Sequence, residues 1–261
     1  VNKKTKIFID NRFYLKKIAL NIYKKSFDNV NKKIIDNKNI QKFICNINKN
    51  LKIIGITITG KVFHIDWESN INNEYKLDNK NIGNIDPNEI INFHSIKKDF
   101  KNYLCILNSD GRFKKVLFDE DMIKSNRSFA ITKLKNNIKI IDSFISNEEK
   151  NLIILTSIGR IFKFNLSDEF LTPSTKQSQG LILAKLLPTE LIVSCCPYQN
   201  GKNIYLVSKQ GKIFRVNTDE ICSANEFSLG YLNERTQLKN DSFLKVLPSN
   251  HYLDIETNKN K

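Results

Sequence analysis

Four copies of one short pattern recur along the chain, and they constrain its fold more than any other feature. Each copy has about four apolar residues, then Thr, Asn or Ser, two variable residues, a glycine, a basic residue and an apolar stretch. The glycines are Gly60, Gly111, Gly159 and Gly211, which are 51, 48 and 52 residues apart. Short β-branched runs favour buried strands, and glycine supplies the positive φ of a tight turn. Each copy therefore predicts a β-hairpin.

A further apolar stretch lies before each hairpin, near residues 43–45, 90–93, 140–144 and 191–196. Four strands in each unit of about 50 residues are typical of radially arranged blades. We therefore expect an all-β, propeller-like fold of about five four-stranded blades that spans residues 1–261 as one domain. The predicted hairpins lie near residues 7–17, 53–65, 104–116, 152–164 and 204–216.

The two ends of the repeat array are incomplete. Residues 7–17 form a degenerate first hairpin, with Asn11 in place of the glycine because Asn also tolerates left-handed geometry. Residues 243–247 stand where a further blade would begin. The simplest prediction is that these two segments share one blade and close a ring of five. The alternative is an open blade in a piece of a longer chain, with six blades in the full-length protein.

The chain is strongly basic. It has 42 Lys and Arg against 27 Asp and Glu, a net charge of +15, which indicates a polyanionic partner. Residues 1–50 hold 13 basic and 3 acidic residues, whereas residues 51–261 hold 29 and 24. An AT-rich gene also raises Lys and Asn content, so the position of the charge is more informative than its total.

Basic residues recur at fixed offsets from the glycines. One set follows each glycine directly: Lys61, Arg112, Arg160 and Lys212. A second set lies four positions after it: His64, Lys115, Lys163 and Arg215. Radial repetition predicts a basic rim that holds a phosphate backbone without reading bases. The candidate DNA-binding residues are these two sets together with Arg12, Lys16, Lys17 and Lys114.

Two simpler interpretations stand beside the basic rim. Charged residues in hairpins also prevent edge-to-edge aggregation of sheets. The aromatic residues of the hairpins, Phe63, Phe162 and Phe214, are expected in the core rather than stacked on bases. In a variant with Arg160, Lys163, Lys212 and Arg215 replaced by Ala, we expect weaker salt dependence of DNA binding and an intact fold.

Catalytic and metal-binding patterns are not found in the sequence. The three histidines, His64, His94 and His251, have no triad or ligand spacing around them, and no phosphate-binding glycine loop occurs. The acidic pairs at residues 119–120, 168–169 and 219–220 are expected to be solvated strand ends. The five cysteines are interpreted as buried thiols in a reducing compartment: Cys45, Cys105, Cys195, Cys196 and Cys222. We expect no metal, no cofactor and no membrane span.

The repeated hairpin and its trailing acidic pair resemble the C-terminal β-pinwheel of bacterial type IIA topoisomerases. That family comprises the A subunits of DNA gyrase and of topoisomerase IV. The resemblance covers nearly the whole chain and is clearest over residues 152–247, where Gln177-Ser178-Gln179-Gly180 falls at the place of the family's Gln-Gly or Arg-Gly element before the next blade. The Gln-Arg-Arg-Gly-Gly-x-Gly box of gyrase has no good copy here, which leaves gyrase-type and topoisomerase IV-type activity open.

The resemblance implies a non-catalytic domain that wraps double-stranded DNA around its basic rim and presents it for ATP-dependent strand passage. It further implies that the catalytic tyrosine, ATP and Mg²⁺ belong to other parts of the enzyme. The implied partners are the ATPase B subunit, through a preceding N-terminal region, and a second copy of the A subunit, in the bacterial cytoplasm near the nucleoid. The alternative function is a propeller-like scaffold that binds acidic protein partners.

Overall fold

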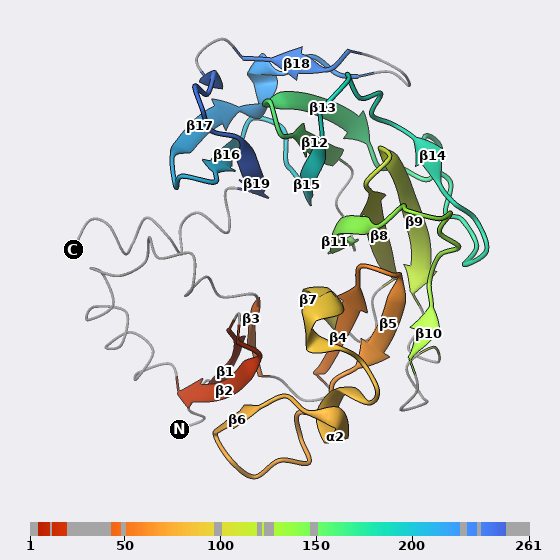
Figure 1. Cartoon of the computed structure of the whole chain (residues 1–261), viewed down its shortest axis with the longest axis vertical. Coiled ribbons are helices and arrows are strands. Elements are labelled where there is room, and N and C mark those ends of the chain that lie inside the picture. The colour runs from red at the N-terminus through yellow and green to blue at the C-terminus, as the bar shows by residue number, and fades with distance from the viewer. Residues whose placement is uncertain are drawn as a thin grey trace.

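Five antiparallel sheets are arranged radially around a common centre (Figure 1). This computed structural model describes residues 5–10, 12–19, 43–47, 51–96, 101–118, 122, 128–146, 151–224, 229–233 and 236–248. Each sheet contains one of the predicted hairpins. The hairpin strands are β1 (Thr5–Ile9) with β2 (Tyr14–Ala19), β4 (Lys52–Thr57) with β5 (Lys61–His64), β8 (Asn102–Asn108) with β9 (Arg112–Phe118), β12 (Asn151–Thr156) with β13 (Arg160–Asn165), and β16 (Asn203–Ser208) with β17 (Ile213–Asn217).

An inner and an outer strand flank each of the first four hairpins. The inner strands, nearest the centre in Figure 1, are β3 (Phe43–Asn46), β7 (Ile90–Ile96), β11 (Ile140–Ser146), β15 (Ile192–Pro197) and β19 (Phe243–Pro248). The outer strands are β6 (Glu74–Lys76), β10 (Phe129–Ala130), β14 (Leu181–Ile182) and β18 (Tyr231–Leu232). The short helical segments are α2 (Asn79–Ile82), η1 (Pro87–Glu89) and η3 (Thr218–Glu220). No helix in the described part of the chain is long and apolar enough to cross a membrane.

Consecutive blades exchange strands. The outer strand of each of the first four sheets comes from the chain after the next hairpin, so β6 follows β5 but pairs with β2. In the same way β10 pairs with β5, β14 with β9 and β18 with β13. Each blade is therefore completed by its neighbour.

The prediction that both ends of the chain share one blade is wrong. β19 pairs with β16 in the fifth sheet, whereas the first hairpin pairs with β3 and β6. The reason is the phase of the repeat, because each inner strand follows its own hairpin and does not precede it. Five hairpins thus give five separate sheets. Within the described residues the fifth sheet has three strands, with β17 outermost.

The hairpin turns pack closely on the next stretch of chain, which explains their glycines. Gly111 has a φ of 83°, and a Cβ built there would lie 2.1 Å from the carbonyl oxygen of Ala184. At Gly159, with a φ of 94°, a Cβ would lie 2.6 Å from the ring of Phe243. In the first hairpin the positive φ, 63°, belongs to Phe13. Asn11, which we expected there, lies outside the described residues.

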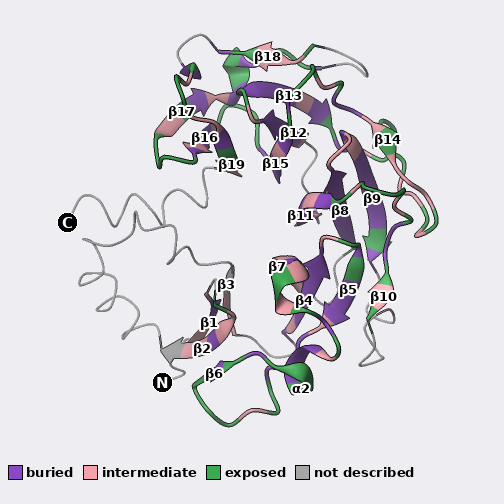
Figure 2. Cartoon of the chain, viewed as in Figure 1, coloured by how far each residue is buried: buried purple, intermediate pink, exposed green. Residues whose placement is uncertain are grey.

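Four apolar clusters lie between consecutive blades, one at each junction. The junction of the third and fourth sheets, for example, buries Phe113 of β9 against Leu152 and Phe162 of the next hairpin. Burying a side chain of this size contributes about 1.5–3 kcal/mol. Phe63 and Phe162 are core residues as expected, and the half-buried Phe214 packs on the last cluster. The ring is therefore held together at its blade junctions (Figure 2).

The cysteines are only partly buried, contrary to expectation. Cys105, Cys195 and Cys196 are buried, Cys45 is half-buried and Cys222 is exposed. Burial raises the pKa of Cys45 to about 12. Burial also raises the pKa of Cys195 and Cys196, so these three thiols are protonated at neutral pH.

A polar cluster joins the inner strands. The Asp142 carboxylate of β11 accepts hydrogen bonds from Asn92 Nδ2 of β7 at 2.8 Å and from Ser194 Oγ of β15 at 2.7 Å. Lys245 of β19 lies 2.8 Å from the same carboxylate. Asp142 is almost fully buried, and burial alone would raise its pKa, but the charge of Lys245 and the hydrogen bonds from Lys245, Ser194 and the Cys195 amide hold it below the usual value. One carboxylate thus links four consecutive blades.

Candidate nucleic-acid interface

The hairpin turns define one edge of the blades, here called the turn edge. The chain that leaves each outer strand returns to this edge: the Ile131 amide donates to Gly60 O, the Leu183 amide to Gly111 O and the Phe243 amide to Ser157 O. The opposite edge, where the return strands β5, β9, β13 and β17 end, is called the open edge. An antiparallel hairpin necessarily places its turn and its open end at opposite edges of the sheet.

Exposed basic side chains gather at the turn edge. They belong to the turns and to the segments that return to them: Arg12, Lys61, Lys133, Lys135, Lys139, Lys185, Lys209, Lys212 and Lys239. Two acidic side chains of this edge are held in ion pairs, Asp110 with Arg112 at 3.0 Å and Glu190 with Arg160. The turn edge is therefore predominantly positive.

Exposed acidic side chains gather at the open edge. They follow the return strands of three hairpins: Glu68, Asp168, Glu169, Asp219 and Glu220. Lys101 also lies there, 3.6 Å from Asp168. The acidic pairs at 168–169 and 219–220 are solvent-exposed strand ends, as expected, whereas residues 119–120 lie outside the described residues. Exposed lysines thus predominate at the turn edge, where Asp86 is also exposed, and exposed carboxylates predominate at the open edge.

Arg160, a predicted DNA-binding residue, is buried. Its Nε donates to Glu190 Oε1 at 2.8 Å, its Nη2 contacts the other carboxylate oxygen, and Nη1 donates to Leu229 O at 2.6 Å. Burial alone would raise the pKa of Glu190, but the hydrogen bonds from Arg160 and the Leu187 amide hold it below its usual value. With its donors occupied inside the protein, Arg160 cannot contact a phosphate.

The basic residues four positions after the glycine join successive blades. Lys115 Nζ lies 2.7 Å from Asp168 Oδ1, beyond the return strand of the next hairpin. Lys163 Nζ makes the equivalent reach and donates to Thr218 O at 3.0 Å and to Ile221 O at 3.2 Å. Lys115 is buried and Lys163 is half-buried. Recurrence at this offset reflects contact between blades.

Lys114 is also an internal residue. Its Nζ donates to Ile131 O at 2.9 Å, to Lys176 O at 3.1 Å and to Ser178 O at 2.8 Å. Burial lowers the pKa of this ammonium group to about 8. The prediction that Lys114, Lys115 and Arg160 bind DNA is therefore wrong, because their charged groups are buried against protein acceptors.

The remaining predicted residues differ in accessibility. Arg12, Lys61, Lys212 and Arg215 are exposed. Lys16 Nζ lies 2.9 Å from Glu74 and Lys17 Nζ donates to Asn70 O at 2.7 Å. Burial and, next, the charge of Lys52 lower the pKa of His64 from 6.5, so this residue is neutral at pH 7. His64 thus adds no charge to the surface, and DNA binding by the exposed residues stays a prediction.

Sequence reasoning missed most lysines of the turn edge. Lys133, Lys135 and Lys139 lie on the segment that runs from the Gly60 turn to the turn of the next blade. Their close spacing in Lys133-x-Lys135 was visible in the sequence. Their position at the turn edge depends on the strand exchange, which the repeat pattern does not reveal.

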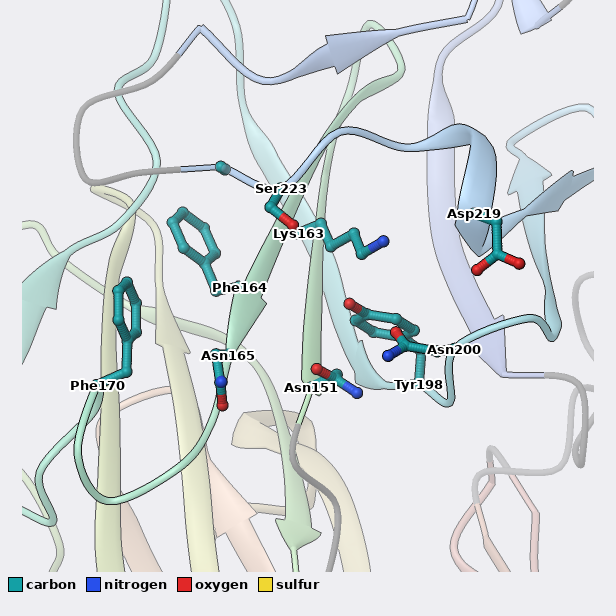
Figure 3. A pocket seen from close by; sticks show the side chains of 10 residues that line it. Asn151, Lys163, Phe164, Asn165, Phe170, Tyr198, Asn200, Asp219 and Ser223 are labelled. Carbon is teal, nitrogen blue, oxygen red and sulfur yellow. The ribbon is translucent and has the colours of Figure 1, made fainter.

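A pocket lies at the open edge between the fourth and fifth sheets (Figure 3). Lys163, Tyr198 and Asp219 line it, with Lys163 Nζ 5.6 Å from the centre of the Tyr198 ring. The Lys163 ammonium and the Asp219 carboxylate already bind backbone groups of the protein. No group of three metal-ligating side chains occurs in the residues that the structure describes. The pocket therefore offers no chemistry comparable to that of the turn edge.

Comparisons with known proteins agree with this architecture. Residues 150–195 and 202–221, in the fourth and fifth blades, match the family model described as "DNA gyrase C-terminal domain, beta-propeller". A curated relative, the A subunit of DNA topoisomerase 4 from Synechocystis sp. (strain ATCC 27184 / PCC 6803 / Kazusa), is 25% identical over 156 residues. That match covers 56% of this chain and 17% of the relative's length.

Solved structures share the fold over almost the entire chain. The C-terminal domain of DNA topoisomerase IV has a TM-score of 0.68 at 16% identity and covers 94% of this chain and 77% of its own. The E. coli ParC C-terminal domain has a TM-score of 0.63 at 12% identity, with 94% and 98% covered. The DNA gyrase A C-terminal domain has a TM-score of 0.53 at 15% identity, with 93% and 98% covered. The chain thus shares the β-pinwheel fold of the C-terminal domains of DNA gyrase A and topoisomerase IV, and its fourth and fifth blades match the gyrase C-terminal family model.

Proposed function

We propose that this domain binds duplex DNA along the turn edge and bends it around the arc of blades. The observation that carries the proposal is the separation of charge, with exposed lysines at the turn edge and exposed carboxylates at the open edge. A polyanion is attracted to the first edge and repelled by the second. A phosphate backbone is recognised by such a surface without regard to base sequence.

The arc of blades supports bending. Lysines at the turns of several successive blades present charge along a curved line, as Figure 1 shows for the sheets that carry them. Bending a site of about 20–30 bp costs on the order of 1–6 kcal/mol, which several phosphate contacts together would offset. In the A subunit of a topoisomerase, the bent duplex would be presented for strand passage, while DNA cleavage, ATP and Mg²⁺ would involve other parts of the enzyme.

A salt titration of duplex binding tests the proposal. The affinity of the 261-residue chain for a duplex of about 30 bp should fall steeply with salt, because each lysine–phosphate contact releases counterions. Replacing Lys133, Lys135 and Lys139 by Ala should reduce the slope of log K against log salt by about 2–3. Fluorescence anisotropy of a labelled duplex measures both effects.

The control changes charge at the open edge. A Lys101→Ala, Lys202→Ala variant loses exposed lysines beside the acidic residues and should keep the slope of the unmodified chain. Equal losses in the two variants would contradict a turn-edge site. Weak duplex binding that does not improve with duplex length would instead favour the alternative, a scaffold for acidic proteins.

A further inference from the structure

At the fourth blade, the turn edge exposes aliphatic side chains. Ile158, at the tip of the β12–β13 turn, is 48% exposed, and Leu191, on the segment that returns to this turn, is 62% exposed. The two residues are held together because the Ser157 amide donates to Leu191 O at 2.8 Å and the Leu191 amide donates to Ser157 Oγ at 3.1 Å. Two exposed aliphatic side chains therefore lie on hydrogen-bonded neighbouring segments of a mainly basic edge.

The third blade has the same local structure with polar side chains. The Ser109 amide donates to Lys139 O at 2.8 Å and the Lys139 amide donates to Ser109 Oγ at 3.1 Å. Lys139 thus occupies the position of Leu191, and Asp110 occupies the position of Ile158. In the second and fifth blades the tip residues are Thr59 and Gln210. The apolar tip is consequently a property of the fourth blade and is not required by the turn.

Directly after its turn glycine, the fourth blade carries no exposed cation, and its nearest exposed cation is Lys185, whose carbonyl accepts from Arg160. Arg160, directly after Gly159, is turned inward to Glu190, whereas Lys61 and Lys212 at the same offset are exposed. A duplex that follows the turn edge from the lysines of the third blade to Lys209 and Lys212 of the fifth must pass this apolar tip. There it meets aliphatic side chains at the tip of the turn, beside the single exposed lysine Lys185.

We propose that Ile158, supported by Leu191, is a wedge that inserts between stacked base pairs from the minor groove and kinks the duplex at the fourth blade. This inference rests on the proposed function. Aliphatic wedges of this kind unstack one base step and bend DNA by roughly 20–90° toward the major groove. Lysines on both sides would hold the two arms of the kinked duplex. The kink would fall at flexible pyrimidine–purine steps, which unstack at low cost.

The test compares three variants of the chain on a duplex of about 30 bp with a single central TA step, a pyrimidine–purine step of the flexible class. The duplex carries a donor–acceptor pair at its ends and a fluorescent purine analogue at the step. Ile158→Ser with Leu191→Ser removes the wedge. Ile158→Leu retains an aliphatic tip. Ile71→Ser removes an isoleucine that is 97% exposed in the loop between β5 and β6, away from the turn edge.

The unmodified chain, the Ile158→Leu variant and the Ile71→Ser control should shorten the end-to-end distance and raise the fluorescence of the analogue. The double serine variant should lose the fluorescence rise and bend the duplex at least about twofold less, with an unchanged salt slope because no phosphate contact is removed. A duplex without a pyrimidine–purine step should show a smaller difference between these proteins.

Several outcomes would overturn the wedge. If the double serine variant bends the duplex and unstacks the step as the unmodified chain does, the apolar tip does not enter DNA, as would be the case for a protein-docking site. If the Ile71→Ser control has the same effect, the change is not specific to the tip. Absence of any salt-dependent duplex binding would remove the proposed function itself, and the salt titration separates that result from a failure of the wedge alone.

Discussion

The same hairpin pattern places its basic residues in different environments in the middle blades, the third and fourth, and in the fifth blade. In the middle blades, Lys115, Arg160 and Lys163 extend to acceptors of the adjoining chain and are wholly or partly buried. In the fifth blade, the equivalent Lys212, directly before β17, and Arg215 of β17 are exposed, and β17 has no outer strand among the described residues. At the position four residues after the glycine, a basic residue therefore joins blades where another blade packs against it, as Lys115 and Lys163 do, and is a surface charge where none does, as at Arg215.

The largest effect that tests this comparison is expected at Arg160. Replacing Arg160 with Met leaves the buried Glu190 carboxylate unpaired, which should lower the free energy of unfolding by about 3–5 kcal/mol. The matched control is Arg112→Met, at the same offset in the third blade, where the partner Asp110 is only half-buried. That change should cost about 0–1 kcal/mol. Urea unfolding measures both values.

This prediction replaces the expectation that a variant lacking Arg160 keeps an intact fold. A stable Arg160→Met variant with a reduced salt slope in DNA binding would restore Arg160 to the surface and contradict the comparison. Adding Glu190→Gln to Arg160→Met removes the unpaired charge and should recover part of the lost stability.

An intermediate effect is expected at Lys163, which occupies the same position of the repeat as Arg215. Lys163→Met removes the charged donor to the carbonyls of Thr218 and Ile221 and should cost about 2 kcal/mol, the contribution of hydrogen bonds from a charged group. Arg215→Met, on the exposed face of β17, should change stability by no more than about 0.5 kcal/mol. Thermal unfolding of the two variants gives the comparison directly, and equal losses would contradict it.

The smallest effect on stability is expected in the polar cluster that joins the inner strands. His94 of β7 lies 2.8 Å from Ser143 Oγ, close to Asp142 and Lys245. Burial lowers its pKa to about 4, against 6.5 in the unfolded chain, although Asp142 acts in the opposite direction. The unfolded chain therefore binds more protons between these two pKa values, and stability falls as the pH decreases from about 6.5 toward 4.

Between pH 7.5 and 5.5 this proton uptake should lower the free energy of unfolding by about 1 kcal/mol. A His94→Gln variant lacks the titrating group, so it should lose less stability over the same range. The difference between the two proteins, measured by urea unfolding at both pH values, isolates His94. An identical pH dependence would mean that His94 is accessible to water in the folded protein.

The hairpins could be predicted from the sequence because turn chemistry is local. A polar residue three positions before a glycine specifies the turn, and Gly111 and Gly159 have the expected positive φ. The glycine positions also gave the blade period. The phase of the blades could not be obtained in this way, because an apolar run such as 243–247 pairs equally well with a hairpin before or after it. The pairing of β19 with the hairpin before it, through β16, decided the architecture.

The candidate site was predicted less well than the fold. Lys61, Lys212 and Arg215 are exposed as expected, but Lys114, Lys115 and Arg160 are buried, and the lysines of segment 131–140 were not predicted. A cation has the same sequence signature whether it faces a phosphate or a neighbouring carbonyl. Only the position of the adjoining blade distinguishes the two environments.

The sequence alone determined the local features of this protein: five hairpins with a spacing near 50 residues, their turn glycines and a basic composition. Tertiary structure decided which blade each inner strand joins, the exchange of outer strands and the separation of charge between the turn edge and the open edge. The physical reason is the distance along the chain over which each effect acts. Turn geometry depends on neighbouring residues, whereas burial of a charge depends on acceptors that lie about 50 residues away in the chain, as between Lys163 and Thr218.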